Sequence, residues 1–260
     1  MFKYILSVFA FLLCFIAQAQ TTISNANKPN LSTEVVKKAT KHKVLIVPFE
    51  PRMYMSQIDH KINEETKWNQ KKIREAIRFG LDDELYKCAK KKQEVLSFLD
   101  DTVKYKKDLF KTYSVIRYNY EKIPDQNKYE APKSEKEKQA IQKGQIIADT
   151  DNEGKFMNVK VKDSTLLHAF TTKYKTDVFL FINQVDIITS DVVGTLINST
   201  QRTITVHYTI FSASGKEINS GISTVNFPST VNHPAKIASM YLSKIAEEIV
   251  TRMEKSMQLK

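Results

Sequence analysis

The acidic residues before Gly154 have the spacing with which an EF-hand calcium loop begins. Asp149, Asp151 and Glu153 alternate along the chain and precede Gly154, which matches the oxygen ligands and the sharp turn of such a loop. The twelfth position, where a bidentate glutamate closes the calcium cage, is Lys160, and the residues after the loop have a strand pattern instead of a helix pattern. The sequence therefore favours an ordinary polar turn over a calcium site.

A second acidic cluster contains a histidine. It consists of Asp59, His60, Glu64 and Glu65, and in a helix His60 and Glu64 would share one face. No second histidine lies nearby to complete a set of nitrogen ligands for zinc, so a solvated helix start is the simpler interpretation. We expect no metal site and no cofactor.

The usual catalytic motifs are missing from the sequence. There is no GxxxxGK[ST] or GxGxxG phosphate loop, no GxSxG elbow and no HExxH pair. We therefore expect no catalytic residues and no enzyme, and a hydrolase without a recognisable motif is the rival interpretation.

Two stretches have residue types that suit contact with another protein. The first is an apolar loop after the first strand, formed by Met53, Tyr54 and Met55, which we predict to bind a partner at the carboxyl end of a sheet. The alternative is that these side chains fold back onto the core. The second is one face of a predicted strand, formed by His207 together with Thr203, Thr205 and Thr209. This face is either a flat docking surface or merely a solvent-exposed side of the sheet.

The elements that would position these residues form an α/β fold with a mixed sheet. The apolar runs Val44–Phe49 and Val178–Ile182 predict adjacent or near-adjacent central strands, buried on both faces, at about 43–49 and 178–187. Alternation at about 202–227, broken by a Gly-Lys turn, predicts an antiparallel hairpin. Helices starting near Asn69 and Pro234 should flank the sheet.

The helix from Asn69 has a clear apolar stripe, and Arg78 and Asp82 fall away from it. The stripe consists of Ile73, Ile77, Leu81, Leu85 and Cys88. Its position on this stripe predicts that Cys88 is an inert core residue. The chain at about 95–155 is predicted to be a largely helical and polar insertion, with a helical pattern from Val95 to Phe110 and a strand near 115–120. A further strand is predicted just after it, at 156–161.

Residues 1–20 have the pattern of an export signal. Lys3 precedes a short apolar run at 5–16, and Ala17-Gln18-Ala19 matches a cleavage site. Residues 21–42 are expected to be a linker, and 43–260 one α/β domain. Removal of the signal would leave Cys88 as the one cysteine, so we expect no intramolecular disulfide.

The chain is strongly basic, with 40 Lys and Arg against 29 Asp and Glu and a net charge of +11. For an exported protein this charge points to an anionic membrane surface, an acidic glycan or an acidic protein before nucleic acid. A merely soluble, lysine-rich surface also explains it.

The order of elements resembles a family of exported bacterial α/β domains. The resemblance rests on the strand end Val47-Pro48-Phe49, the helix after it, the short helix before the second strand, the hairpin turn Gly215-Lys216 and the closing helix. The family includes the curli secretion channel lipoprotein, the amino-terminal domain of the Tol-system propeller protein and lipoproteins that activate penicillin-binding proteins. The chain departs from it by the insertion and by Leu13, which does not suit a lipobox before Cys14.

The resemblance implies a non-enzymatic module of the cell envelope that binds or assembles with other proteins. We expect an exported protein of the periplasm, the outer membrane or the medium, with an envelope protein or a second copy of the chain as its partner. A basic binder of anionic envelope polymers is the alternative of a different class.

Overall fold

The computed structural model describes residues 41–132, 141–142, 145–146, 154–163, 165–190 and 201–258. The fold below belongs to the unit Thr40–Lys260. The signal peptide expected at 1–20, nearly all of the linker at 21–42 and the acidic residues Asp149 to Glu153 lie outside the described residues.

The main sheet has the order β10–β9–β8–β1–β3, and a short strand, β2, also pairs with β8. Its strands are β1 (Lys43–Val47), β2 (Tyr54–Ser56), β3 (Glu94–Ser97), β8 (Val178–Ser190), β9 (Gln201–Ser212) and β10 (Glu217–Pro228). β1 pairs in parallel with both β3 and β8, whereas β8–β9 and β9–β10 are antiparallel. The predicted α/β class, the adjacent central strands and the hairpin are confirmed.

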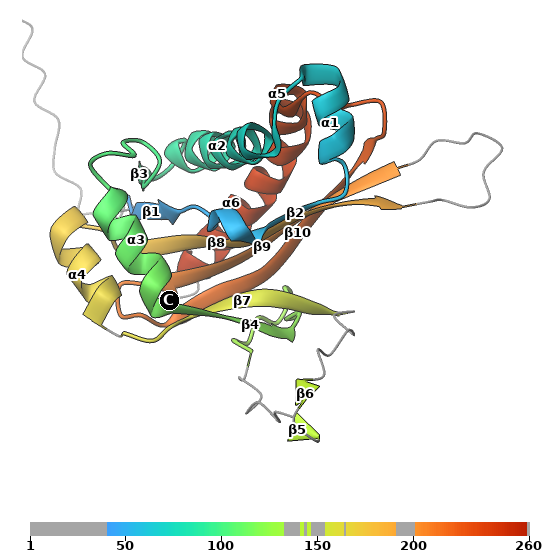
Figure 1. Ribbon diagram of the computed structural model, residues 1–260. Coiled ribbons are helices and arrows are strands. Elements are labelled where there is room, and N and C mark those ends of the chain that lie inside the picture. Colours follow the sequence, from blue (N-terminus) through green and yellow to red (C-terminus); the bar gives the residue numbers. More distant parts are fainter. Residues whose placement is uncertain are drawn as a thin grey trace, which may run out of the picture. The chain divides into compact units, whose positions relative to one another are not determined.

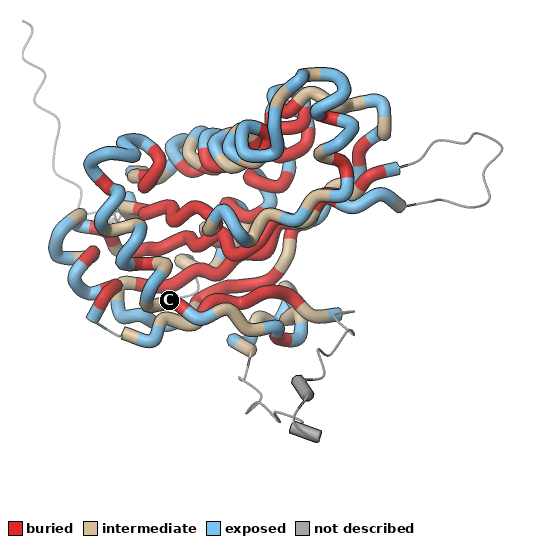
Figure 2. Tube along the Cα trace, in the orientation of Figure 1, coloured by how far each residue is buried: buried red, intermediate tan, exposed pale blue. Residues whose placement is uncertain are grey.

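β1 and the first part of β8, residues 178–182, are continuously apolar, and their side chains are buried on both faces of the sheet. Val44 and Ile46 of β1 point into a core that α2 (Gln70–Lys90) and α6 (Ser243–Gln258) cover. Leu45 and Val47 point into a second core on the opposite face, with Phe179 of β8. Figure 1 shows the sheet between these layers, and Figure 2 shows its strands as the most buried part of the chain.

The helices on the first face begin and pack as their residues require. The side chain of Asn69 caps α2 by accepting a hydrogen bond from the Lys72 amide at 2.9 Å. The last helix runs from α5 (Pro234–Ile237) through a π-helical turn, η2 (Ala238–Leu242), into α6. Gly80 allows α2 to approach this turn, because a Cβ at residue 80 would lie 2.8 Å from the Ala238 Cβ.

The opposite face carries two helices and a two-stranded ribbon. These are α3 (Lys106–Val115), α4 (Thr165–Tyr174) and the antiparallel pair of β4 (Ile116–Lys122) with β7 (Lys155–Val161), called the β4–β7 ribbon below. The strands predicted near 115–120 and at 156–161 are confirmed. A separate pair joins β5 (Ile141–Gln142) to β6 (Gln145–Ile146). The remaining elements are a 3-10 turn, η1 (Pro51–Met53), and α1 (Asp59–Thr66).

The helical prediction from Val95 onward is wrong for its first part. Glu94–Ser97 is the edge strand β3, with Val95 opposite Val44 and Leu96 opposite Leu45. A pair of apolar residues fits a strand as well as a helix, and the pairing partner lies about fifty residues earlier, so local periodicity could not reveal it. β3 also covers Asp82, which is buried instead of lying on the solvent face of α2.

Cys88 is half-buried and packs at the edge of the core between α2 and α6, so its predicted full burial is wrong. Desolvation nevertheless raises the pKa of its thiol, which keeps the thiol protonated near neutral pH. Among the helices of the described residues, none combines the length and the apolar composition that a membrane span requires.

Candidate functional site

Met53, Tyr54 and Met55 do lie just after β1, but they do not form a loop. Met53 ends η1, and Tyr54 and Met55 begin strand β2, which pairs in parallel with Val185–Ile187 of β8. The cause is the length of β8: β1 pairs with residues 178–181 only, so the next stretch of the same β8 edge is open to β2.

The three side chains have different surroundings. Tyr54 is partly buried: its ring stacks on Phe49 at 6.3 Å, and its hydroxyl donates to Asp59 Oδ1 at 2.7 Å. Burial raises the pKa of the Tyr54 phenol, and the Asp59 carboxylate adds to the rise. Met53 is half-buried, whereas Met55 is 52% exposed. Tyr54 thus completes the core, and Met55 is the member of the trio that is free to contact a partner.

Met55 belongs to an uncovered end of the sheet. The strand register places Met55, Asp186, Thr205 and Thr224 in one row across β2, β8, β9 and β10. The next row along the same face contains Ile188, Thr203 and Asn226, and Ile188 is 44% exposed.

Tyr120 of the β4–β7 ribbon borders this sheet end. The amide nitrogen of Gln184 lies 3.5 Å from the Tyr120 hydroxyl and 4.0 Å from the Met55 sulfur, so the two side chains approach the same group. Tyr120 is itself exposed. We call the following set the Met55 surface: Met55, Tyr120, Asp186, Ile188, Thr203, Thr205, Thr224 and Asn226.

Only part of the threonine-lined face of β9 is open to solvent. Thr203 and Thr205 remain half-buried and bond to Asn226 and Thr224, whereas His207 and Thr209 are buried beneath β7. The interpretation of His207 as an exposed docking residue is therefore wrong. The covering ribbon comes from a distant part of the chain, and nothing in the alternation of β9 indicates it.

The hydrogen bonds of His207 fix its tautomer. Its Nδ1 accepts from the Met157 amide at 2.8 Å, so the ring proton is on Nε2, which donates to Asp186 Oδ2 at 2.9 Å. The histidine thus joins the ribbon to the sheet, and its second nitrogen positions a carboxylate of the Met55 surface.

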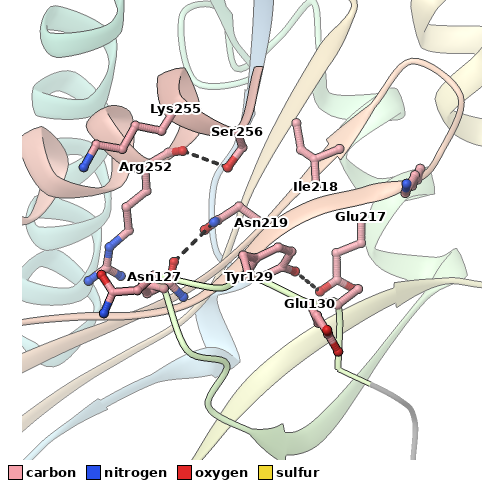
Figure 3. Close-up of a pocket in the computed structure, with 12 residues that line it drawn as sticks. Asn127, Tyr129, Glu130, Glu217, Ile218, Asn219, Arg252, Lys255 and Ser256 are labelled. Atoms are coloured by element: carbon pink, nitrogen blue, oxygen red, sulfur yellow. Dashed lines mark hydrogen bonds between the residues drawn. The ribbon is translucent and has the colours of Figure 1, made fainter. Parts of the chain in front are cut away.

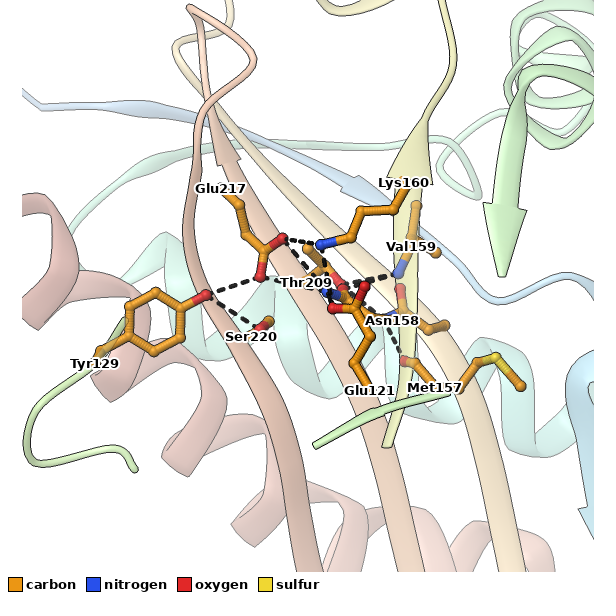
Figure 4. Close-up of polar contacts among 10 residues, drawn as sticks. Glu121, Tyr129, Met157, Asn158, Val159, Lys160, Thr209, Glu217 and Ser220 are labelled. Atoms are coloured by element: carbon orange, nitrogen blue, oxygen red, sulfur yellow. Dashed lines mark hydrogen bonds and ion pairs between the residues drawn. The ribbon is translucent and has the colours of Figure 1, made fainter. Parts of the chain in front are cut away.

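A buried cluster of charges also attaches the β4–β7 ribbon to β10 (Figure 4). The Lys160 ammonium lies 3.1 Å from Glu121 Oε2 and 3.0 Å from Glu217 Oε2. Asn158 donates to Glu121 Oε2 at 2.6 Å, and Thr209 donates to the Asn158 oxygen. The other carboxylate oxygen of Glu121 is buried and has no hydrogen-bond partner among the described residues. Lys160, expected only as an obstacle to calcium, is thus a structural ion-pair residue.

A cavity of about 700 Å³ lies on the other side of Glu217, between residues 126–131, β10 and α6 (Figure 3). Tyr129 donates to Glu217 Oε1 at 2.8 Å, and burial raises the pKa of the Tyr129 phenol. Gln126 holds the segment against β10 by donating to the Ser220 carbonyl at 2.8 Å, an approach that needs Gly221, since a Cβ there would lie 2.8 Å from Gln126 Nε2.

The cavity has groups of both charges, as well as neutral hydrogen-bonding groups. Lys216 and Lys255 line it together with Glu130 and Glu217. The Arg252 guanidinium donates hydrogen bonds to the Tyr208 hydroxyl, the Ile222 carbonyl and the Glu248 carboxylate. The volume lies in the usual range for small-molecule sites, but typical ligand pockets are mostly apolar.

The second acidic cluster has structural partners. Asp59 and His60 do begin a helix, α1, where Asp59 accepts the Tyr54 bond and Glu64 pairs with Lys61 at 3.0 Å. Among the described residues, no three His, Cys, Asp or Glu side chains are grouped so that they could hold a metal ion.

No protein-family model matches the chain, and no curated protein matches it. Among the solved structures that are similar to it, two are described as lipoproteins of bacteria. Lipoprotein GNA1162 from Neisseria meningitidis is 14% identical, with a TM-score of 0.36 over 81% of this chain and 99% of that one. A minor lipoprotein from Acinetobacter baumannii is 15% identical, with a TM-score of 0.23 over 36% of this chain and 80% of that one. At these scores the similarities carry no conclusion about function.

Proposed function

We propose that the protein is a non-enzymatic module of the cell envelope that binds a protein partner through the Met55 surface. The observation that carries the proposal is the gathering of exposed Met55, Ile188 and Tyr120 at an uncovered sheet end. Methionine and tyrosine are suited to such contacts, because they offer large adaptable surfaces with few fixed hydrogen-bond directions. The export signal expected at residues 1–20 supports the compartment.

The backbone of β2 adds a second means of recognition. β2 pairs with β8 on one side, and no described strand pairs with its other side. An extended segment of a partner could add to this edge, with backbone hydrogen bonds supplying affinity and Met55 supplying specificity. The partner is an envelope protein, and a second copy of this chain is the alternative.

The proposal predicts that a double variant, Met55→Ser with Ile188→Ser, loses its partners without losing its fold. We expect recovery of co-purifying proteins from envelope fractions to fall at least about tenfold, since truncating central interface residues costs roughly 1–2 kcal/mol each. The free energy of unfolding should change by less than about 0.5 kcal/mol per site, because both side chains are exposed. Size-exclusion chromatography of the unchanged protein and of the double variant tests whether the partner is a second copy of the chain.

A matched control is the variant Phe79→Ser with Met240→Ser, which removes two equally exposed apolar side chains from α2 and η2. It should keep the partners. Retention of every partner by the Met55 variant, or equal losses in both variants, would refute the proposal. Tyr54 is left unchanged, because its core contacts make its truncation a test of stability and not of binding.

A further inference from the structure

The turn before α3 and the first part of α3 expose two apolar side chains to an unusual degree. Val103 is 87% exposed and Phe110 is 76% exposed, more than any other large apolar side chain of the described residues. Side chains this exposed contribute little to the core, and exposed apolar side chains that are grouped on a surface are a common mark of an interaction site.

Both side chains lie near the start of α3 and away from the core. The chain makes one helical turn before α3, since the Tyr105 amide donates to the Asp101 carbonyl at 3.0 Å, and Val103 lies in that turn. Phe110 lies in α3 itself and is exposed. The opposite face, with Tyr105, Leu109 and Thr112, packs toward the core or is partly buried there.

Lysines surround these two side chains. Lys106 and Lys107 follow Val103 by three and four residues and precede Phe110 by four and three, so they lie between the two. Lys104 and Lys111 flank them. None of the four ammonium groups pairs with a carboxylate of the described residues, and the Lys104 ammonium instead lies 5.0 Å from the Tyr105 ring.

Each acidic side chain of the same segment has a hydrogen-bond or ion-pair partner. Asp101 Oδ1 accepts from the Val103 and Lys104 amides at 3.1 and 2.9 Å, and Asp100 Oδ2 accepts from the Ser97 amide at 2.8 Å. Asp108 is paired with Lys173 at 2.6 Å and bonded by Tyr174. The segment 100–111 therefore has four lysines against three aspartates, and one of these aspartates, Asp108, is paired with Lys173 from outside the segment. Counted together with Lys173, these side chains carry a net positive charge.

We infer that residues 101–111 dock the protein on an anionic phospholipid bilayer. Val103 and Phe110 enter the headgroup region, and Lys104, Lys106, Lys107 and Lys111 lie at the level of the lipid phosphates. Apolar side chains set among lysines are the pattern of a helix that lies in the membrane interface, where apolar burial and attraction to anionic lipids act together. This surface shares no residue with the Met55 surface, so it adds a membrane contact to the proposed partner binding.

The test is co-sedimentation of the protein, recovered after export, with vesicles of equal parts phosphatidylglycerol and phosphatidylcholine. Binding to vesicles of phosphatidylcholine alone should be much weaker. The triple variant Lys106→Gln, Lys107→Gln and Lys111→Gln should bind roughly 100-fold less tightly, since each lysine near an anionic surface contributes about fivefold. The variant Val103→Ser with Phe110→Ser should bind about tenfold less tightly.

Matched controls change the same residue types elsewhere in the chain. They are Lys71→Gln, Lys91→Gln and Lys236→Gln together, and Phe79→Ser with Met240→Ser, all at exposed positions. Both should bind as the unchanged protein does. Because residues 1–40 are the same in every protein compared, the apolar run at 5–16 cannot produce a difference between them.

A fluorescence measurement separates insertion from simple attraction. In a Trp68→Phe background, which removes the one tryptophan, Phe110→Trp should shift to shorter emission wavelengths on anionic vesicles. Equal binding to both vesicle types, equal losses in the controls, or loss in the lysine variant without any emission shift would overturn the inference. The last result would indicate attraction to an anionic polymer or surface in place of docking in a bilayer.

Discussion

Asp82 is the described side chain whose chemistry departs furthest from its sequence pattern. It lies on the α2 face that helical spacing assigns to solvent, yet β3 covers it, and the Ser97 hydroxyl donates to its carboxylate at 2.7–2.8 Å. Burial raises the pKa of Asp82 to about 7; the Ser97 bond opposes the rise and Asp100 adds to it. Sequence could not reveal this, because the covering strand is not visible in local periodicity.

The raised pKa makes stability depend on pH. Because the folded-state pKa of Asp82 lies above its unfolded value of about 3.9, the folded protein holds the proton more tightly, and the free energy of unfolding falls as pH rises from about 4 to above 7. The full loss is up to about 4 kcal/mol. Asp82→Asn should remove this slope and be more stable than the unchanged protein at pH 8, as measured by urea unfolding between pH 5 and 8.

The neighbouring carboxylate provides the control for that series. Asp83 is exposed and pairs with Lys87, so Asp83→Asn should leave the pH dependence nearly unchanged. If the curves of Asp82→Asn and the unchanged protein run parallel, Asp82 is not the group that titrates.

At the scale of elements, long periodic segments were predictable and short paired strands were not. The stripe of α2, the helix start at Pro234 and the apolar runs of β1 and β8 are local patterns, and each is found where its residues predict it. β2 and β3 are three and four residues long and exist because a neighbouring strand has a free edge. The position of the β4–β7 ribbon over His207 depends on contacts between distant residues for the same reason. Met55 is exposed, whereas Tyr54 is partly buried against the core and His207 is buried.

The ribbon is held by polar groups, so removing its central cation should loosen it. Lys160→Met leaves Glu121 and Glu217 without their shared ammonium in a mostly buried site, and we expect the free energy of unfolding at pH 7 to fall by roughly 2 to 3 kcal/mol. Lys162→Met, at an exposed lysine near the end of the same strand, is the control.

A triple variant shows whether the charge cluster or the packing of the Lys160 stem stabilises the ribbon. Lys160→Met together with Glu121→Gln and Glu217→Gln removes all three charges and should regain most of the stability. If it is as unstable as Lys160→Met alone, packing of the lysine stem, and not the charge cluster, stabilises the ribbon.

At the scale of the whole molecule, the sheet is shared by two cores whose side chains alternate along β1. The sequence predicted both central strands because a strand between two cores has no solvent face. It could not predict what forms the second core, since its aromatic side chains come from the residues between β3 and α3 and from α4. Phe98, Tyr105, Phe170 and Tyr174 meet there with ring centroids 5.5–5.9 Å apart.

Because one strand serves both cores, we expect them to unfold together. Leu45→Ala truncates the core with Phe179, whereas Trp68, the one tryptophan of the chain, packs against the core of α2 and α6. If the sheet unfolds cooperatively, Leu45→Ala should lower the free energy of unfolding by about 2 to 5 kcal/mol. The unfolding transition followed by Trp68 fluorescence should then coincide with the transition followed by circular dichroism. Ile46→Ala, which truncates the core beside Trp68, should shift both signals similarly. A Leu45→Ala variant whose Trp68 transition stays in place while the circular dichroism transition moves would mean that the two cores unfold independently.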